Sequence, residues 1–381
     1  MIFKSKKIFI LAASPLTIEF FFRPHINVLA KEYDVYLAFN KVNDDYVLPL
    51  NLPVTQIQLD IYRKVSILAD IRCFFQLISL YKKYRFDIVL TLVPKAGLLG
   101  IASAWLTRIP VRIHIFQGEV WSNCRGILRS IYKYADTVTA LFATHILAVS
   151  HSEKSFLVGS GVVDARKIQV LGAGSIGGVD LKRFNPNSYS SKSIRSELGI
   201  PVEAFVIIFI GRIVRDKGIF ELVDAFNLLS RQYLNIHLLI VGPDEEGLAG
   251  TLFNPSKSNA SKVTVIGYTR NPERYLSAAN ILCLPSHREG FGMVILEAAA
   301  MGIPAIGSKI YGVSDAILDN ETGLLFQKGS AKSLADKIKK IIEDPNLQQS
   351  LGAAAKLNVQ NHFDADQVIK QYVDFIGRTV K

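Results

Sequence analysis

The sequence of 381 residues predicts an α/β protein with two doubly wound domains, each a parallel sheet with helices on both faces. Short, almost continuously apolar runs alternate with longer runs of helical period, which is typical of buried parallel strands and their crossover helices. The alternation occurs twice, and a polar, Ser-rich segment at 185–192 separates the two series. We therefore expect a first domain over 1–184, a second over 185–363, and a C-terminal helix over 364–381 that packs back on the first.

The first series contains seven candidate strands and three candidate helices. The strands are expected at 7–13, 33–39, 54–59, 86–92, 111–116, 145–150 and 167–171, and the helices at 66–84, 95–107 and 127–143. The turn after the first strand, Ala-Ser-Pro-Leu at 13–16, is not the G-x-G-x-x-G of a standard dinucleotide fold. The first domain is therefore expected to be Rossmann-like without binding a dinucleotide cofactor.

The second series repeats the pattern with six candidate strands and five candidate helices. The strands are expected at 205–210, 236–241, 262–266, 281–284, 304–307 and 323–326, and the helices at 218–231, 272–279, 292–301, 331–342 and 346–362. In doubly wound domains the ligand lies at the carboxyl ends of the strands. Two such domains facing each other across a cleft would place the ligand between them.

The positive charge is concentrated in the first half of the chain. The net charge is +11, and residues 1–183 carry 23 Lys and Arg against 13 Asp and Glu, whereas 184–381 carry 21 against 20. Many of the basic residues stand beside aromatic and aliphatic ones, and no base-reading motif accompanies them. This pattern favours an anionic membrane surface over nucleic acid as a partner. A merely solvated basic face is the alternative.

The chain shows no sign of a disulfide framework, a zinc site or a membrane span. Its three cysteines, Cys73, Cys124 and Cys283, lie far apart without a C-x-x-C pair, which fits a reducing compartment. No apolar run reaches the ~18–20 residues that a spanning helix needs. The apolar run near the N-terminus is short and leads into Pro15 and Glu19 rather than a cleavage site. We expect a cytoplasmic protein, peripheral on the cytoplasmic face of the inner membrane.

Two glutamates flank a glycine-rich turn in the second series. Glu289 precedes a Gly-Phe-Gly turn, and Glu297 lies eight residues further on, in the helical run. A strand that ends in such a turn and restarts as a helix presents backbone N–H groups to an anion. The residues expected around a ligand at this turn are Gly290, Phe291, Gly292 and Met293. The alternative is an ordinary loop acid followed by a solvated helix acid.

Basic residues follow the first strand of the second series. Gly211 ends that strand, and Arg212 and Lys217 place two cations beside the next helix N-terminus. Cations are unfavourable there unless an anion neutralises them, and a forked guanidinium, an ammonium and backbone donors suit a diphosphate. An ordinary basic loop is the alternative. Gly242 and Tyr268 follow the next two strands and could line a flat pocket for a base.

Taken in order, these motifs resemble the retaining glycosyltransferases of family 4, which have the GT-B fold. The resemblance is strongest in Gly-Arg…Lys-Gly at 211–218, Glu-Gly-Phe-Gly…Glu at 289–297 and Asn-Glu-Thr-Gly-Leu-Leu at 320–325. The first half adds 114–121 and 171–180. These are similar to the subgroup that extends polyprenyl-diphosphate-linked glycans for capsule, O-antigen or protein glycosylation.

The resemblance implies a role for each candidate residue of the second domain. Arg212 and Lys217 would hold the donor diphosphate, Glu297 would bind the ribose hydroxyls, and Glu289 would face the donor sugar. The backbone N–H groups of Phe291, Gly292 and Met293 would meet phosphate or sugar.

The resemblance also implies two positions in the first domain. His114 would lie beside the donor sugar, and the turn at Ser14 would approach the diphosphate or the acceptor. A lone histidine in an apolar strand is more often a packed structural residue, which is the alternative for His114.

We therefore predict a retaining, metal-independent glycosyltransferase that moves a hexose or N-acetylhexosamine from a UDP-sugar to a lipid-linked saccharide. The chain's Asp-x-Asp at 364–366 opens the last helix rather than ending a strand, so no metal and no cofactor are expected. Arg212 and Lys217 would stabilise the leaving diphosphate, and no protein nucleophile is expected. The alternatives are a sugar-nucleotide epimerase of the same architecture and a non-enzymatic, two-lobed sugar-nucleotide-binding protein.

Overall fold

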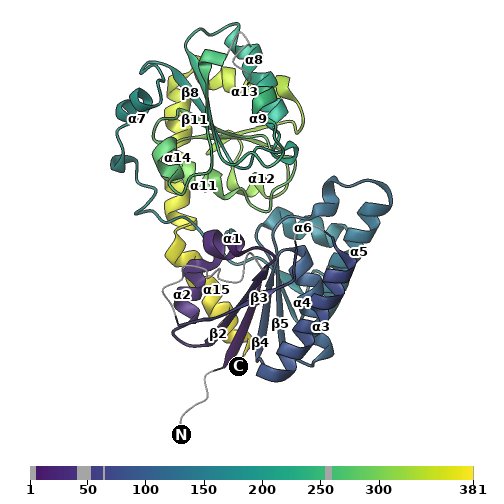
Figure 1. The fold of residues 1–381 in the computed structure, drawn as a ribbon. Helices are drawn as coiled ribbons and strands as arrows, with labels where there is room; N and C mark the ends of the chain where they lie inside the picture. Colours follow the sequence, from purple (N-terminus) through teal and green to yellow (C-terminus); the bar gives the residue numbers. More distant parts are fainter. Residues whose placement is uncertain (1–5, 41–52, 63–64, 254–259, 381) are drawn as a thin grey trace. The chain divides into compact units, whose positions relative to one another are not determined.

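The computed structural model describes residues 6–40, 53–62, 65–253 and 260–380, which form two compact units (Figure 1). The first unit comprises Met1–Gly177 and Asp366–Lys381, and the second Gly178–Ala365. The division falls before Gly178 rather than after residue 184, because the intervening segment bonds to the second unit. The Val179 N–H donates to the Phe363 carbonyl at 2.8 Å, and Arg183 pairs with Glu273 at 2.9 Å.

The first unit has a seven-stranded parallel sheet in the order β3-β2-β1-β4-β5-β6-β7. Its strands are β1 (Lys7–Leu11), β2 (Asp34–Asn40), β3 (Thr55–Leu59), β4 (Ile88–Leu92), β5 (Val111–Phe116), β6 (His145–Ala148) and β7 (Ile168–Gln169). All of them were predicted. The direction in which successive strands are added to the sheet reverses between β1 and β4. The crevice expected of a doubly wound domain is therefore at the carboxyl ends of these two strands.

Three predicted helices of the first unit are confirmed, and others were missed. The predicted ones are α3 (Ile67–Tyr84), α4 (Pro94–Leu106) and α5 (Gly126–Phe142). The missed ones are α1 (Pro15–Thr17), the π-helix η1 (Ile18–Phe22), α2 (Arg23–Leu29), the 3-10 turn η2 (Val120–Asn123) and α6 (His151–Gly159). Two prolines and an aromatic run hide the period of 15–29. The C-terminal helix α15 (Ala365–Thr379) bonds within this unit, where the Tyr372 hydroxyl donates to the Ser175 carbonyl at 3.0 Å.

The second unit has a six-stranded parallel sheet in the order β10-β9-β8-β11-β12-β13. Its strands are β8 (Phe205–Ile210), β9 (Ile236–Val241), β10 (Val263–Ile266), β11 (Ile281–Leu284), β12 (Ala305–Ser308) and β13 (Gly323–Phe326). This is the 3-2-1-4-5-6 order of nucleotide-binding doubly wound folds. The predicted class, two Rossmann-like α/β domains with parallel sheets, is confirmed.

The helices of the second unit include all five that were predicted. These are α8 (Ile219–Ser230), α10 (Pro272–Leu276), α11 (Met293–Ala300), α13 (Ala331–Glu343) and α14 (Pro345–His362). Shorter elements are η3 (Pro186–Ser188), α7 (Ser191–Glu197), η4 (Arg215–Lys217), α9 (Ala249–Leu252), η5 (Ala260–Lys262) and α12 (Val313–Ala316).

The polar segment predicted as a linker is folded into the second unit. The Ser190 side chain caps α7 by accepting from the Ser193 N–H at 3.4 Å. Arg195 of α7 then donates to the Ala278 carbonyl at 2.9 Å and to Asn280 Oδ1 at 2.8 Å. Its serines therefore serve as helix cap and first turn rather than as flexible chain.

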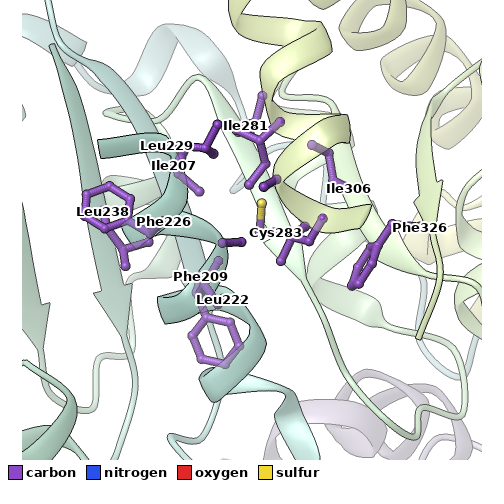
Figure 2. Packing of buried hydrophobic residues seen from close by; sticks show 14 of the residues in the cluster. Ile207, Phe209, Leu222, Phe226, Leu229, Leu238, Ile281, Cys283, Ile306 and Phe326 are labelled. Carbon is purple, nitrogen blue, oxygen red and sulfur yellow. The ribbon is translucent and has the colours of Figure 1, made fainter. Parts of the chain in front are cut away.

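The core of the second unit fixes where its crevice lies. Helices α8 and α13 cover one face of the sheet, and Ile338 of α13 belongs to the same core cluster. Phe226 and Leu229 of α8 lie on the side of Phe209 and Cys283 of the strands (Figure 2). The chain leaves β8 toward β9 but leaves β11 in the opposite direction, toward β12. Right-handed crossovers therefore place α8 and α11 on opposite faces, and their N-termini flank the carboxyl ends of β8 and β11.

No helix among the described residues is both long enough and apolar enough to pass through a bilayer.

Candidate active site

Two loops of the second unit, after β8 and after β11, are locked together at the crevice. The His287 N–H donates to the Asp216 carbonyl at 2.9 Å, and Arg288 pairs with the Asp216 carboxylate at 3.1 Å. Gly218 has φ +69°, and a Cβ there would lie 2.0 Å from the Pro285 carbonyl oxygen, so no other residue fits. The two loops are therefore positioned as one rigid edge.

Lys217 and Glu289 form an ion pair across this edge. The Lys217 ammonium contacts Glu289 Oε1, which also accepts from the Ser286 hydroxyl at 2.8 Å. The Lys217 and Glu289 side chains are only 21% and 13% exposed. An ammonium has three donor hydrogens, so the pair leaves Lys217 able to contact a second anion. The structure thus brings together two residues that the sequence predicted for one site.

Arg212 extends the cationic edge toward β9. Its guanidinium pairs with Glu245 at 2.7 Å, and the neighbouring Ile213 N–H donates to the Pro243 carbonyl at 2.8 Å. The Arg212 side chain is about one-third exposed, so its remaining donors are open to an anion. Two predicted cations, Arg212 and Lys217, thus lie on the one loop that ends β8, as expected of a diphosphate cradle.

The glycine turn contributes backbone rather than side chains. Gly292 has φ +78° and forms the N-cap of α11, where its carbonyl accepts from the Ile295 N–H at 2.8 Å. Phe291 is 3% exposed and packs on Phe363, with 5.4 Å between ring centroids. Gly290 precedes Phe291, and Met293 follows Gly292 as the first residue of α11. The partial positive charge of the α11 N-terminus is therefore directed at the same edge.

Gly242 and Tyr268 lie at the same edge of the sheet, after β9 and β10. Gly211 and Gly242 continue the ladders, donating to the Val241 carbonyl at 2.9 Å and to the Ile266 carbonyl at 3.0 Å, respectively. The Tyr268 ring is half-exposed. The structure places both residues on the edge that was predicted to receive a flat base.

Glu297 lies in the second turn of α11 in a charged environment that the sequence did not reveal. Burial raises the pKa of Glu297 to about 7, nearby Arg183 acts to lower it, and nearby Glu273 acts to raise it. Arg183 is itself paired with Glu273 and donates to the Arg270 carbonyl. Arg183 and Glu273 are 90 residues apart, so no spacing could have linked them. Because its pKa is near 7, Glu297 changes charge in the physiological range.

The first unit has its own topological switch point, between β1 and β4, where a ligand crevice is expected. Ser14 follows β1 with an extended backbone and accepts from the Thr17 N–H at 3.2 Å, at the start of α1. Val93 follows β4 with φ +68°, a conformation that is costly for a β-branched residue and that gathers at binding sites. Ser14 thus lies in the turn after β1, and its approach to the diphosphate or the acceptor stays a prediction. Val93 was missed, because its residue type gives no signal of strain.

His114 does not lie at the edge of the sheet, where a role beside the donor sugar would require it. Its side chain is 1% exposed, and its Nδ1 lies 2.8 Å from the Thr91 hydroxyl within the sheet. Helix α4 covers it at Gly97, where a Cβ would lie 2.4 Å from the ring. Burial lowers the pKa of His114 to about 3, so the ring is neutral. The geometry supports the packing alternative.

Replacement of His114 by alanine should therefore lower stability more than turnover. Removing a buried ring costs about 3–5 kcal/mol in large-to-small core substitutions, and the Thr91 hydroxyl would keep only its bond to the Ile113 carbonyl. The folded fraction should keep a kcat within about threefold of wild type, because a substitution in the core acts mainly on stability. Urea unfolding measures the loss of stability, and initial rates below the melting transition measure kcat. A stable variant with a hundredfold lower kcat would restore the catalytic role.

A buried acidic cluster lies at the carboxyl ends of β5 and β6, and the sequence analysis missed it. Glu153, which is fully buried, accepts from the Gly118 N–H and from the Val149 N–H at 2.8 Å. Burial, followed by the neighbouring Glu119, raises the pKa of Glu153 well above its usual range. Asp136 nearby accepts from the Trp121 indole at 2.8 Å. The buried Glu153 carboxyl therefore holds the loop that leaves β5.

The described residues contain no group of three or more His, Cys, Asp and Glu side chains that could hold a metal ion. The Asp-x-Asp at 364–366 opens α15, and the Val179–Asp364 bridge ties its first residue to the second unit's backbone.

Comparison with known proteins gives one family model and relatives that cover most of the chain. The model "Glycosyl transferases group 1" matches residues 190–358, which contain both locked loops. The capsular polysaccharide biosynthesis glycosyltransferase CapM of Staphylococcus aureus is 31% identical over 325 residues, covering 83% of each chain. An Escherichia coli UDP-Gal:alpha-D-GlcNAc-diphosphoundecaprenol alpha-1,3-galactosyltransferase is 25% identical over 328 residues, covering 82% of each.

Among solved structures, the HepE protein of Anabaena in complex with UDP superposes with a TM-score of 0.78. The match covers 98% of this chain and 100% of that one at 17% identity, so it bears on the fold.

Proposed function

Because the chain belongs to the group 1 glycosyltransferases, we propose that it transfers a sugar, with retention of anomeric configuration, from a UDP-sugar to a saccharide on a polyprenyl diphosphate. A glycosyltransferase was predicted from the sequence, and family membership confirms that class. The E. coli relative acts on a diphosphoundecaprenol-linked sugar, and the S. aureus relative functions in capsule synthesis, which supports a lipid-linked acceptor in surface-glycan assembly. The names of the E. coli enzyme and of the HepE complex support UDP as the nucleotide.

The observation that carries the proposal is the edge formed by Lys217, Glu289 and Arg212 at the carboxyl ends of β8 and β11. It combines two cations, a helix N-terminus and a fixed carboxylate. A nucleotide-sugar needs this set: positive charge for the diphosphate and an acceptor for sugar hydroxyls. Glu297 on the next turn of α11 would accept from the ribose hydroxyls.

The chemistry follows from where charge develops. Breaking the sugar–phosphate bond places positive charge on the anomeric carbon and negative charge on the leaving diphosphate. Arg212, Lys217 and the N–H groups at the α11 N-terminus would stabilise that negative charge without rearranging. In this proposal the leaving phosphate oxygen takes the proton of the acceptor hydroxyl on the same face, which gives retention.

Glu289 has no place as a nucleophile in this scheme. Its carboxylate is held by Lys217 and Ser286, which lowers the reactivity of a lone pair and fixes the group as a hydrogen-bond acceptor. It would instead bind hydroxyls of the donor sugar and orient the anomeric carbon.

We also propose that the first unit binds the acceptor at its β1–β4 crevice, where Ser14 and the strained Val93 lie. The enzyme would be peripheral on the cytoplasmic face of a membrane with anionic lipids, and no nucleic-acid partner is proposed. The excess of Lys and Arg in residues 1–183 supports this placement.

A donor screen tests the activity. The protein is incubated with single UDP-sugars and short-chain polyprenyl-diphosphate saccharides, and products are read by mass spectrometry and by NMR of the new anomeric proton. We expect one donor to add one sugar with the donor's anomeric configuration. A donor converted to its epimer without any acceptor would support the epimerase alternative. An inverted linkage would refute retention.

The same assay tests metal independence. Because Arg212 and Lys217 would neutralise the diphosphate in place of a divalent ion, we expect full turnover in excess EDTA. Loss of turnover in EDTA, with recovery on added Mn²⁺ or Mg²⁺, would contradict this part of the proposal.

Donor affinity should depend on pH through Glu297. Its pKa of about 7 in the free protein means that the accepting carboxylate becomes populated as the pH rises through 7. If only the ionised form binds the ribose, affinity should increase about tenfold between pH 6 and pH 8. Calorimetry with the intact UDP-sugar avoids the phosphate ionisation of UDP near pH 6. Glu297→Gln should bind more weakly and with a flat profile, and a profile unchanged by this substitution would remove Glu297 from the ribose site.

A further inference from the structure

Helix α5 of the first unit is amphipathic, but its apolar face is exposed to solvent. Its buried positions are Asp136, Thr139 and Ala140. Its solvent-facing positions are Ile127, Leu128, Ile131, Tyr134 and Leu141, each more than half exposed. Residues 127, 131, 134 and 141 follow a helical period, so they form one stripe along the helix. An ordinary surface helix would place this stripe against the core.

The first half of α3 presents a second apolar face of the same kind. Ile67, Leu68, Ile71 and Phe75 are all exposed, and Leu68 is 82% exposed. Helix α4 packs against both α3 and α5 (Figure 1). Since α3 follows β3 and α5 follows β5 in one parallel sheet, both helices begin at the carboxyl edge of that sheet. Apart from Leu141 near the end of α5, the two apolar faces therefore flank α4 on the side of the edge where Ser14 and Val93 lie. We call these nine residues the α3–α5 apolar surface.

The charges beside the α3–α5 apolar surface are mainly positive. Helix α3 contributes Arg72, and α5 contributes Arg129 and Lys133, while Lys82 and Lys83 lie in the last turn of α3. Arg72 lies 3.9 Å from Asp60, and the acids of the two helices are engaged elsewhere. Asp70 is paired with Lys95 at 2.8 Å, and Asp136 is buried against Trp121. An apolar face bordered mainly by cations matches the headgroup region of an anionic bilayer.

We propose that the α3–α5 apolar surface docks the enzyme on an anionic lipid membrane, with the apolar side chains inserted at the level of the headgroups and the cations on lipid phosphates. Charge favours this occupant over a second copy of the chain. A two-fold contact through the same surface would bring Arg72, Arg129 and Lys133 of the two copies together. The proposal deepens the proposed function, on which its relevance to a lipid-linked acceptor rests. Docking is measured without substrates, so docking and transfer can fail separately.

The test compares matched pairs of substitutions in the full chain. Leu68→Asp with Ile131→Asp places charge in the surface, and Leu234→Asp with Leu357→Asp does the same in the second unit. Leu234 and Leu357 are 86% and 58% exposed, close to Leu68 and Ile131 at 82% and 54%. We expect wild-type protein to co-sediment with vesicles of equal phosphatidylglycerol and phosphatidylcholine, and the first pair to bind at least tenfold more weakly. The second pair should bind like wild type.

Three further measurements separate docking from its rivals. Binding should weaken at least tenfold on pure phosphatidylcholine, and also when salt rises from about 0.05 M to about 0.5 M. Tyr134→Trp should shift its emission to shorter wavelength on the anionic vesicles, and Leu234→Trp should not. Turnover of a soluble short-chain acceptor should be equal in both pairs, which shows that the variants are folded.

Equal vesicle binding by both variant pairs would overturn the proposal. A wild-type dimer in light scattering that the Leu68 and Ile131 pair converts to a monomer, without vesicle binding by either, would assign the surface to a second copy. Vesicle binding without the Tyr134→Trp shift would contradict insertion and leave only electrostatic adsorption.

Discussion

Replacing Lys217 with alanine should reduce kcat by about two to three orders of magnitude, the cost of losing one well-placed donor to a developing anion. Lys217 is largely buried, ends the β8 loop, and already contacts Glu289. Its removal takes a cation from the leaving diphosphate and also leaves the Glu289 carboxylate with one fewer partner. The decrease in kcat/KM should therefore exceed the decrease in UDP affinity.

The control for Lys217→Ala is Lys339→Ala. Lys339 also faces a glutamate, Glu343 at 3.8 Å, but that pair lies on the exposed side of α13. Removing an exposed pair changes little, so kcat and stability should be unchanged. Lys217→Arg is informative as well, because a planar guanidinium does not reproduce a compact ammonium and should recover only part of the activity. Equal rates for wild type and Lys217→Ala would refute the diphosphate role.

Glu289→Ala should lower kcat by about a hundredfold while changing the dissociation constant of UDP by less than about threefold. UDP lacks the sugar, so a residue that binds only sugar hydroxyls contributes to turnover and not to UDP binding. Arg212→Ala should instead reduce UDP affinity and turnover together. Calorimetry with UDP and initial rates with the full donor measure the two quantities.

The Glu289 result also separates an orienting carboxylate from a nucleophile. A nucleophile's alanine variant can be rescued by azide, which attacks the anomeric carbon and gives a glycosyl azide. We expect no rescue and no such product by mass spectrometry. Rescue by azide would contradict the one-face mechanism, and parallel losses of UDP affinity and kcat would contradict the assignment of Glu289 to the sugar.

Much of the fold could be predicted because parallel strands buried on both faces leave continuous apolar runs. Strands β5, β8, β9, β11 and β13 begin and end at the residues predicted. The failures have local causes. In the run 15–29, Pro15 and Pro24 stand in the first turns of α1 and α2, where a helix tolerates proline, and the middle of the run is a π-helix. In the sequence alone the same prolines look like helix breakers. Segment 185–192 reads as a linker because a capping serine and a flexible serine look alike in sequence.

The candidate site was predictable where its residues lie within one loop or its helix. Arg212 and Lys217, and Glu289 with its glycine turn, share short segments, and the topology brings β8 and β11 together. The residues that were missed depend on packing over distance. Arg183 reaches Glu273 near Glu297, and Glu153 reaches Gly118, only through the folded chain. A strand position alone does not show that α4 covers His114 at Gly97.

The most direct test of the central claim is a crystal structure of the protein with UDP. We expect the diphosphate within hydrogen-bond distance of Arg212 and Lys217, at the N-terminus of α11, and the ribose hydroxyls on Glu297. We also expect the base to lie toward Gly242 and Tyr268. UDP bound elsewhere in the second unit, or held without contact to Lys217 and Arg212, would contradict it.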